Sequence, residues 1–427
     1  MSTTTREAAG RCPRCGAAVH GDGRFVVWCA ACDWNVDPAP PDEDRGRPAR
    51  VRRALARRHG EHLLAETTDG GAPGPRRDPA ALAAYAIALL VHGVTVVLAV
   101  GGTWFLVTGW GRPLMAVGLF LLALAWTLRP RPHRPPEDGT PILARADAPE
   151  LYALIDEVAG VVGTRGADLV VVDAGVNASV TTCGVRGRRL LTLGLPLWEI
   201  LTPQQRIALL GHEFGHYSNG DARHGRVLAT AYRSLTTWRY YFAPAPDPSL
   251  LDLLVNLLSL PPRAVVHGVL ALLDQLTLRA TRRAEYLADS AAARAGSTEA
   301  AVGLMDRLLV ADSAMTTLRR EGNAAQVVRR GTEAGDRADG LWERLVADTE
   351  SIPEGEYERQ RRVGALRGHS VDSTHPPTHL RRARLLSATP VPAAVAMTGG
   401  RARAIAAELA ATRRTVARHI VRHGFPG

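Results

Sequence analysis

The chain has 427 residues, enough for two or three domains, and a formal net charge of +10 at pH 7. Every basic residue is Arg or His, because the sequence contains no Lys, and we attribute this to a GC-rich coding bias. Five cysteines, four of them in two Cys-x-x-Cys pairs, exclude a disulfide scaffold and indicate metal chemistry in a reducing compartment. No apolar run precedes Arg11, so we expect no cleaved signal peptide.

The first predicted element is a small zinc ribbon over residues 1–45. Thirteen residues separate its two cysteine pairs, and four thiolates can surround one structural Zn²⁺ as a tetrahedron. The segment Arg24–Trp28 has the composition of a strand. A redox pair is the weaker alternative, since the second pair would then be idle. The four predicted ligands are Cys12, Cys15, Cys29 and Cys32.

A basic linker follows over residues 46–79, in which Arg50–Leu64 can form a short helix. The composition then changes, because Ala80–Val107 and Pro113–Leu128 contain no charged residue. About 20 apolar residues span a bilayer core. We therefore predict a transmembrane helical hairpin over 80–128 that turns at Gly109–Pro113; buried core helices are the alternative.

The arginines around this hairpin give its orientation. Seven precede it between Arg50 and Arg77, three follow it between Arg129 and Arg134, and the turn contains only Arg112. The positive-inside rule places both ends in the cytoplasm. We therefore expect a multi-pass protein of the cell membrane whose N-terminus and catalytic domain face the cytoplasm.

After a second linker, 129–149, the pattern indicates mixed α and β structure. An amphipathic helix is expected at Glu150–Val162 and a strand at Leu169–Val172. A β-hairpin follows from Asn177 to Leu193, turned at Arg186–Gly187. Cys183 in this hairpin is expected to be buried and inert.

The next helix carries the segment Gly211–His216, which contains a His-Glu-x-x-His pattern. Thr202 is a good N-cap, with Pro203 at the first helical position and Gln205 three residues after the cap. The expected end is Asn219–Gly220. The two histidines of the pattern therefore fall near the end of one helix.

His212 and His216, four residues apart, lie about 40° apart around a helix, so both imidazoles can reach one metal ion. Glu213 can reach a water bound to that ion, which is the arrangement of a zinc hydrolase. A third protein ligand must lie downstream. Glu285 is the candidate, and Asp289, one turn later, can accept the free N–H of a ligand histidine.

The rest of the chain is expected to be helical. Residues 226–277 form either a second membrane hairpin or, as we favour, helices that cover the core without spanning. Residues 318–368 are polar and charged, and we expect them to be mobile. The tail over 391–427 contains a basic amphipathic helix, Arg401–His423, that docks either on the core, which we favour, or on an anionic membrane.

Four motifs together resemble the HtpX-like and CAAX prenyl protease family of membrane zinc metallopeptidases, metallopeptidase family 48 within the gluzincins. They stand in the expected order between about 150 and 390, which we assign as the metallopeptidase domain. The resemblance implies an α+β, mainly helical, zincin-like fold with a small edge-strand sheet. The motifs are Gly211–His216, Asn219–Asp221, Arg283–Asp289 and Thr374–Thr378 with Arg381.

The resemblance also implies roles for individual residues. His212, His216 and Glu285 would bind the catalytic Zn²⁺, Glu213 would be the general base, and Asp289 would support a ligand histidine. His375 would stabilise the oxyanion, with His379 as the competing candidate, and Arg381 would support that side of the site. The family binds substrate along an exposed strand, and the matching residues here are Asn177, Ala178, Ser179 and Val180. A plain turn at Asn177 is equally compatible with the sequence.

The predicted function is a membrane-anchored zinc endopeptidase acting on polypeptides, and the heat-shock branch of the family implies membrane proteins in quality control. The alternative is a catalytically inert, membrane-tethered binding protein that uses the ribbon for a partner or nucleic acid. Apart from Phe25, Trp28 and Trp34, the basic segments have no aromatic platform, so we do not expect nucleic acid as a partner. The sequence gives no oligomeric state.

Overall fold

Helices dominate the part of the chain that the computed structural model describes, and strands form two small sheets. The described residues are 7–38, 79–131, 140–184, 186–218, 222–244, 249–327, 338–367 and 376–425. The strands are β1 (Glu7–Arg11), β2 (Ala18–Asp22), β3 (Ile142–Leu143), β4 (Leu169–Asp173), β5 (Ala178–Cys183) and β6 (Arg188–Gly194). The helices up to the long central one are α2 (Pro79–Thr108), α3 (Leu114–Leu128), α4 (Pro149–Val162), α5 (Leu195–Ile200), α6 (Pro203–Ser218), α7 (Ala222–Tyr241), α8 (Leu250–Leu258) and α9 (Leu260–Gly296). The later helices are α10 (Thr298–Leu309), α11 (Ala311–Val327), α13 (Leu341–Glu350), α14 (Glu354–Arg367), α15 (Thr378–Ser387), α16 (Gly399–Glu408) and α17 (Ala410–His423).

The N-terminal module is built on the antiparallel hairpin β1–β2, with Arg11 opposite Ala18. The first cysteine pair lies in the turn of this hairpin, where the Cys12 amide donates to the Ala17 carbonyl. The prediction of a strand at Arg24–Trp28 is wrong. In that segment the Val27 carbonyl accepts from the Asn35 side chain, which takes the place of a strand partner.

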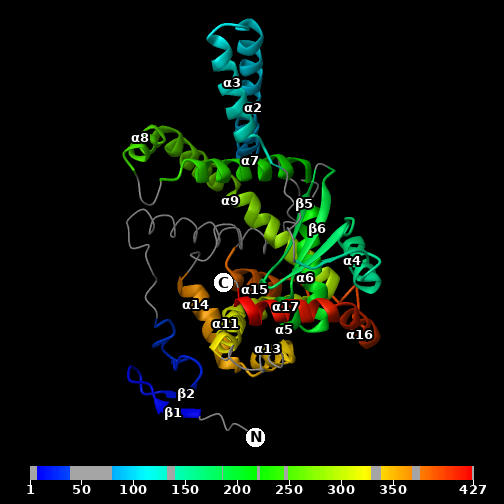
Figure 1. Cartoon of the computed structure of the whole chain (residues 1–427). Helices are drawn as coiled ribbons and strands as arrows, with labels where there is room; N and C mark the ends of the chain where they lie inside the picture. The colour runs from blue at the N-terminus through cyan, green and yellow to red at the C-terminus, as the bar shows by residue number, and fades with distance from the viewer. Residues whose placement is uncertain are drawn as a thin grey trace.

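Helices α2 and α3 form an antiparallel hairpin whose turn end projects away from the rest of the molecule, while the start of α2 packs on α7 and α9 (Figure 1). The two backbones approach closely at two glycines, because a Cβ on Gly118 would lie 2.8 Å from the Gly102 carbonyl oxygen. Small residues at such crossings are typical of helices packed in a membrane. Of the described helices, α2 alone is long and apolar enough to cross a bilayer by itself, and α3 is a shorter apolar helix.

The larger sheet has the strand order β3-β4-β6-β5. Strands β4 and β6 pair in parallel, whereas β5 pairs antiparallel with β6 and forms an edge. The predicted β-hairpin is therefore present, and Cys183 is buried as expected. Helix α5 begins directly after β6 and leads into α6, so the sheet holds the start of α6 in place.

The main hydrophobic core joins this sheet to α4, α6, α9, α10 and the C-terminal helices. The tail forms two helices, α16 and α17, where a single one was expected. Ile405, Leu409, Val416 and Ile420 are all buried in the main core, in agreement with the favoured docking on the core. The expectation of a mobile 318–368 is wrong for its described residues, which are largely helical, because Leu341, Trp342 and Leu345 bury apolar side chains there.

A second core cluster joins the first half of α2 to α7 and the first half of α9. Ala84, Ala88 and Val91 on α2 pack there against Leu235 and Trp238 on α7, among others. Helix α9 then runs on from this cluster into the main core as one helix of 37 residues. The hairpin and the main core are therefore connected through continuous helical structure (Figure 1).

Candidate metal centre

The helix that carries both histidines begins as the sequence predicts. The Gln205 amide donates to the Thr202 hydroxyl and the Thr202 amide donates to the Gln205 side chain, at 3.3 and 3.0 Å. This reciprocal pair is a capping box and it starts α6 at Pro203. Helix α6 extends to Ser218, so His212 and His216 lie on its last two turns; the predicted stop at Asn219–Gly220 falls outside the described residues.

Two glycines bring α6 into close contact with α9. A Cβ on Gly215 would lie 2.9 Å from the Ala288 Cα, and one on Gly211 would lie 3.0 Å from the Ala292 Cα. Any side chain at these positions would push the helices apart. The glycines that flank His212 in the pattern therefore set the distance at which Glu285, one turn before Ala288, meets the histidines.

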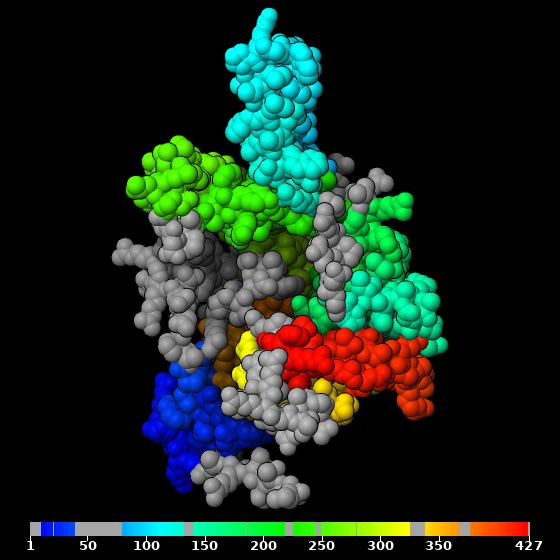
Figure 2. All heavy atoms as spheres, in the orientation of Figure 1, coloured from blue at the N-terminus to red at the C-terminus, as the bar shows by residue number. Residues whose placement is uncertain are grey.

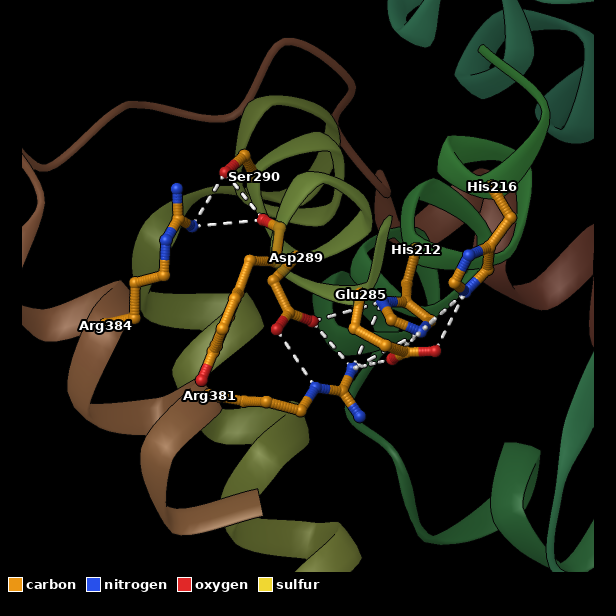
Figure 3. Close-up of polar contacts among 8 residues, drawn as sticks. His212, His216, Glu285, Asp289, Ser290, Arg381 and Arg384 are labelled. Atoms are coloured by element: carbon orange, nitrogen blue, oxygen red, sulfur yellow. Dashed lines mark hydrogen bonds and ion pairs between the residues drawn. The ribbon is translucent and has the colours of Figure 1, made fainter. Parts of the chain in front are cut away.

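Three side chains converge between α6 and α9 (Figure 3). His212 Nε2 lies 3.3 Å from His216 Nε2 and 3.6 Å from one Glu285 oxygen, and the other Glu285 oxygen lies 3.6 Å from His216 Nε2. Bonds of about 2.0–2.1 Å around a tetrahedral Zn²⁺ place ligand atoms about 3.3 Å apart. The spacing and the nitrogen and oxygen donors thus fit zinc, and Glu285 and His212 are buried.

Asp289, one turn beyond Glu285, is completely buried behind His212. One carboxylate oxygen lies 3.1 Å from His212 Nδ1, and Arg381 on α15 donates to both oxygens at 2.6 and 2.9 Å. Burial raises the pKa of Asp289, but the charge of Arg381 and the hydrogen bonds from His212 and Arg381 outweigh it and hold that pKa well below its usual range. Asp289 is therefore held as an anion against Nδ1 of His212.

Arg381 also contacts the cluster directly. Its Nη2 lies 3.2 and 3.3 Å from the two ring nitrogens of His212 and 3.6 Å from a Glu285 oxygen. The neighbouring Arg384 donates from Nη1 to the Tyr286 carbonyl and the Ser290 hydroxyl on α9 (Figure 3). Two arginines thus fasten α15 to the helix that carries Glu285. The sequence singled out Arg381 but gave no signal for Arg384.

The other predicted site residues are placed less completely. Glu213 lies half-buried on α6, between the two histidines in sequence. His375 falls outside the described residues. Its competitor, His379, is on the first turn of α15, and burial lowers the pKa of its imidazole.

The predicted substrate strand, β5, lies at one edge of the larger sheet. The Gly194 amide donates to the Asn177 carbonyl, so in this antiparallel register the polar groups of Ala178, Val180 and Thr182 point away from β6. One of them is occupied, because the Tyr217 hydroxyl donates to the Val180 carbonyl at 2.8 Å. Tyr217, directly after His216, links the edge to α6. The sequence did not predict this contact, because Tyr217 and Val180 are 37 residues apart and no local pattern relates them.

The four N-terminal cysteines form a second possible metal site. Cys12 Sγ lies 3.6 Å from Cys32 Sγ, and Cys15 Sγ lies 3.6 Å from Cys29 Sγ. Bonds of about 2.3 Å to a tetrahedral Zn²⁺ place sulfur atoms about 3.8 Å apart. Burial raises the pKa of Cys12, but backbone hydrogen bonds from Cys15 and Arg14 outweigh it and lower that pKa to about 7. The spacing and the four sulfur donors fit zinc.

The N-terminal module docks on α14 and the end of α13. Buried Arg359 donates to the Val36 carbonyl at 2.8 Å, and Arg362 donates to the Ala30 carbonyl and to Asp33 at 2.7 Å. Arg362 also lies over the Trp28 ring. From the module, Arg24 donates to Ser351. The sequence did not predict this docking, because its partners are more than 300 residues apart.

A family model and a curated relative each match part of the chain. The family model described as Peptidase family M48 matches residues 145–389, more than half of the chain. A protease HtpX homolog from Syntrophobacter fumaroxidans (strain DSM 10017 / MPOB) is 25% identical over 176 residues, which cover 40% of this chain and 62% of that relative. The matched segment thus spans less than two thirds of the relative's length. No solved structure matches the chain.

Proposed function

Because the chain belongs to peptidase family M48, we propose that it is a membrane-anchored zinc endopeptidase. The observation that carries the proposal is the cluster of His212, His216 and Glu285, whose donor atoms all lie within 4.8 Å of one another. Bound there, zinc supplies a Lewis acid that lowers the pKa of a water molecule toward about 7 and polarises the peptide carbonyl.

In this proposal the chain's own residues move and orient the protons. Glu213 accepts the proton of the attacking water and then gives it to the leaving amine. Asp289 accepts the Nδ1–H of His212, which fixes the tautomer and leaves Nε2 as the ligand atom. Arg381 keeps Asp289 ionised in its buried position. For His375 we keep only the oxyanion-stabilising role that the family resemblance suggests.

We propose that an extended substrate adds to the edge strand β5. The outward amides of Ala178 and Val180 would donate to its carbonyls, and the pairing selects extended backbone with little dependence on side chains. Asn177 lies at the end of this edge, and its carbonyl is not available to a substrate because it already accepts from the Gly194 amide. The hydrogen bond from Tyr217 to Val180 holds β5 in position relative to His216, the residue before Tyr217.

The membrane anchor is the α2–α3 hairpin, whose exposed side chains include many large apolar residues. Arginines on both of its flanks support a metal centre on the cytoplasmic side. This location favours membrane proteins as substrates and a role in their quality control. We propose a structural Zn²⁺ in the N-terminal module, which is a zinc ribbon without a catalytic role.

The docking of this ribbon argues against nucleic acid as its partner. The side chains that would stack on bases or bind phosphates, Trp28 and Arg24, contact α14 and Ser351 within the same chain. An inert binding protein also fits poorly, because such a protein has no need of the buried arrangement of Asp289 and Arg381 around a histidine.

The test is cleavage of casein by the purified full chain, together with zinc analysis. We expect cleavage that stops with a zinc chelator and with Glu213→Gln, while Glu350→Gln, the same change at an exposed position on α13, retains it. Two zinc ions per chain should fall to one in Glu285→Ala. Equal cleavage by wild type, the chelated protein and Glu213→Gln would overturn the peptidase assignment.

A further inference from the structure

Helix α8 has its polar and apolar sides arranged in the reverse of a water-soluble helix. Its apolar residues are exposed, Leu254 by 53% and Leu250 by 87%, whereas Asp252, Asn256 and Ser259 are the partly covered ones. No residue of α8 is buried. At 100° per residue the polar residues form one stripe and Leu254 lies opposite it, at the centre of the apolar side. A helix in water would present the opposite side to its protein.

Hydrogen bonds at and near the end of α3, the foot of the hairpin, hold α7 and the start of α9, the two helices that α8 connects. The Leu128 carbonyl, at the end of α3, accepts from the Trp238 indole on α7 at 3.1 Å. Near the end of α7, the Tyr241 hydroxyl accepts from Arg131 at 3.0 Å, and the Phe242 carbonyl accepts from Arg263 at the start of α9 at 2.7 Å. Helix α8 connects these two ends, so it lies at the level of the hairpin's foot (Figures 1 and 2).

The side chains around this foot are those of a membrane interface. Arg129 lies 3.5 Å from the centre of the exposed Trp126 ring, and Arg131 lies over the Tyr241 ring. Tryptophan, tyrosine and arginine are enriched where the hydrocarbon meets the lipid head groups.

The length of the hairpin gives the depth of the foot. Helix α3 has 15 residues, a length of about 22 Å, whereas the hydrocarbon core is about 30 Å thick. The missing length of about 8 Å is made up if the end of α3 lies below the lipid head groups, with the long side chains of Arg129 and Arg131 extending out to them. The stretch of α2 just beyond the end of α3 agrees, because the Thr95 hydroxyl donates to the Leu128 carbonyl and the nearby Leu89 and Leu90 are apolar and exposed. Amphipathic helices in the plane of a membrane bury their apolar side by about 5–10 Å, which matches this depth.

We propose that α8 lies in the plane of the cytoplasmic leaflet, with the side centred on Leu254 among the acyl chains. The inference rests on the proposed membrane anchoring, which it deepens. It assigns to residues 250–258 a second membrane contact that neither spans the bilayer nor covers the core. Because α9 leads directly from α8 to Glu285, this contact fixes the distance between the metal centre and the membrane surface.

The test measures depth in the full-length protein, reconstituted in vesicles of phosphatidylcholine and phosphatidylglycerol. A fluorescent amino acid replaces Leu254 or, as a second position on the same side, Leu257. References are Val97 on the hairpin, Asn256 on the polar side of α8 and Leu366 on α14, all tested singly. The quenchers are lipid nitroxides near the head group, lipid nitroxides near the chain end, and aqueous iodide.

The proposal predicts that the shallow nitroxide quenches the Leu254 and Leu257 probes at least about twofold more than the deep one, with iodide ineffective. Val97 should be reached from lipid, and Leu366 from water alone. Strong quenching of both α8 probes by iodide, with Val97 still in lipid, would overturn the in-plane helix and leave the anchoring intact. Strongest quenching of these probes by the deep nitroxide would overturn it in favour of a spanning segment. Exposure of Val97 to iodide would overturn the anchoring itself.

Discussion

One carboxylate oxygen of Asp289 contacts both an arginine and a histidine: Oδ1 lies 2.6 Å from Arg381 Nη2 and 3.1 Å from His212 Nδ1. Arg381 stabilises the carboxylate as an anion, and in the proposed mechanism this anion orients the imidazole. Asp289 is completely enclosed and Arg381 almost so, which leaves little screening of the two charges by water. The state of α15, which carries Arg381, is thereby coupled to a proposed zinc ligand on α6.

Asp289→Asn should weaken zinc binding about 10- to 100-fold. The neutral amide of the variant lacks the negative charge that, in the proposed mechanism, holds the proton of His212 on Nδ1. Competition with a chromogenic zinc chelator measures this directly, without relying on activity. Asp274→Asn makes the same chemical change on the same helix, far from the cluster, and should bind zinc as the wild type does. Unchanged affinity in Asp289→Asn would remove Asp289 from the support of His212.

Arg381→Met should lower the free energy of unfolding by about 3–5 kcal/mol, because it leaves Asp289 as a buried charge without its guanidinium. Adding Asp289→Asn to Arg381→Met should restore part of that loss, since both members of the pair are then neutral. Thermal unfolding in detergent of the wild type, both single variants and the double variant gives the coupling. Strictly additive losses would show that the two residues do not act as a pair.

The pH dependence of stability should contain a contribution from Asp168 at the start of β4. Burial raises the pKa of Asp168, but the Arg189 amide hydrogen bond and the charge of Arg165 outweigh it and lower that pKa. A depressed folded-state pKa contributes stability above the unfolded value of about 3.9, and this stability is lost as the pH falls through the folded-state pKa. Asp168→Asn should therefore be less stable than wild type at pH 7, by at most about 1 kcal/mol because the side chain is partly exposed.

The difference between wild type and Asp168→Asn should shrink as the pH falls below about 4. Unfolding in urea at pH 7, 5 and 3 measures this difference in unfolding free energy. Asp147→Asn, on the exposed turn before α4, serves as the matched change in the same domain. A difference in unfolding free energy that increases as the pH falls would contradict the predicted effect of Asp168.

Local signals in the sequence were sufficient for the elements around the candidate site. The capping pair at Thr202 and Gln205 gives the start of α6, and the i, i+4 spacing of the histidines places them on one face. The charge-free runs give the bounds of α2 and α3 to within a residue or two. These features depend on neighbours in sequence, so no knowledge of tertiary packing is needed.

What the sequence did not show depends on contacts between distant residues. The unbroken length of α9 was missed because its first half packs on α2 and α7 and its second half on α6, so its apolar pattern changes along the helix. The strand predicted at Arg24–Trp28 failed because side chains of the same module take its hydrogen bonds. The sequence around Arg359 and Arg362 indicates a solvent-exposed helix, whereas in the structure both arginines bind the N-terminal module.

Arg359→Met should release the ribbon from α14 without removing its zinc. Arg359 is buried and joins Glu356 to the Val36 carbonyl, so its loss leaves a buried carboxylate and an unpaired carbonyl. Hydrogen exchange of residues 18–36 should accelerate, while zinc stays at two per chain. Arg344→Met, on α13 away from the ribbon, is the control. Loss of one zinc in Arg359→Met would mean that docking and metal binding are a single event.

Tyr217→Phe should raise KM for an extended peptide several-fold and change kcat little. The hydroxyl contributes one partly buried hydrogen bond to Val180, of about 1 kcal/mol, and that bond helps to position the edge relative to α6. If substrate pairs with β5, methylation of its backbone nitrogens should impair cleavage at alternate positions, because only every second residue of an added strand points its amide to the edge. Peptides methylated one position at a time, assayed on wild type and Tyr217→Phe, measure both effects. The same alternation in the two proteins with a shifted KM supports the edge and the role of Tyr217, whereas equal impairment at every position would exclude strand addition as the mode of binding.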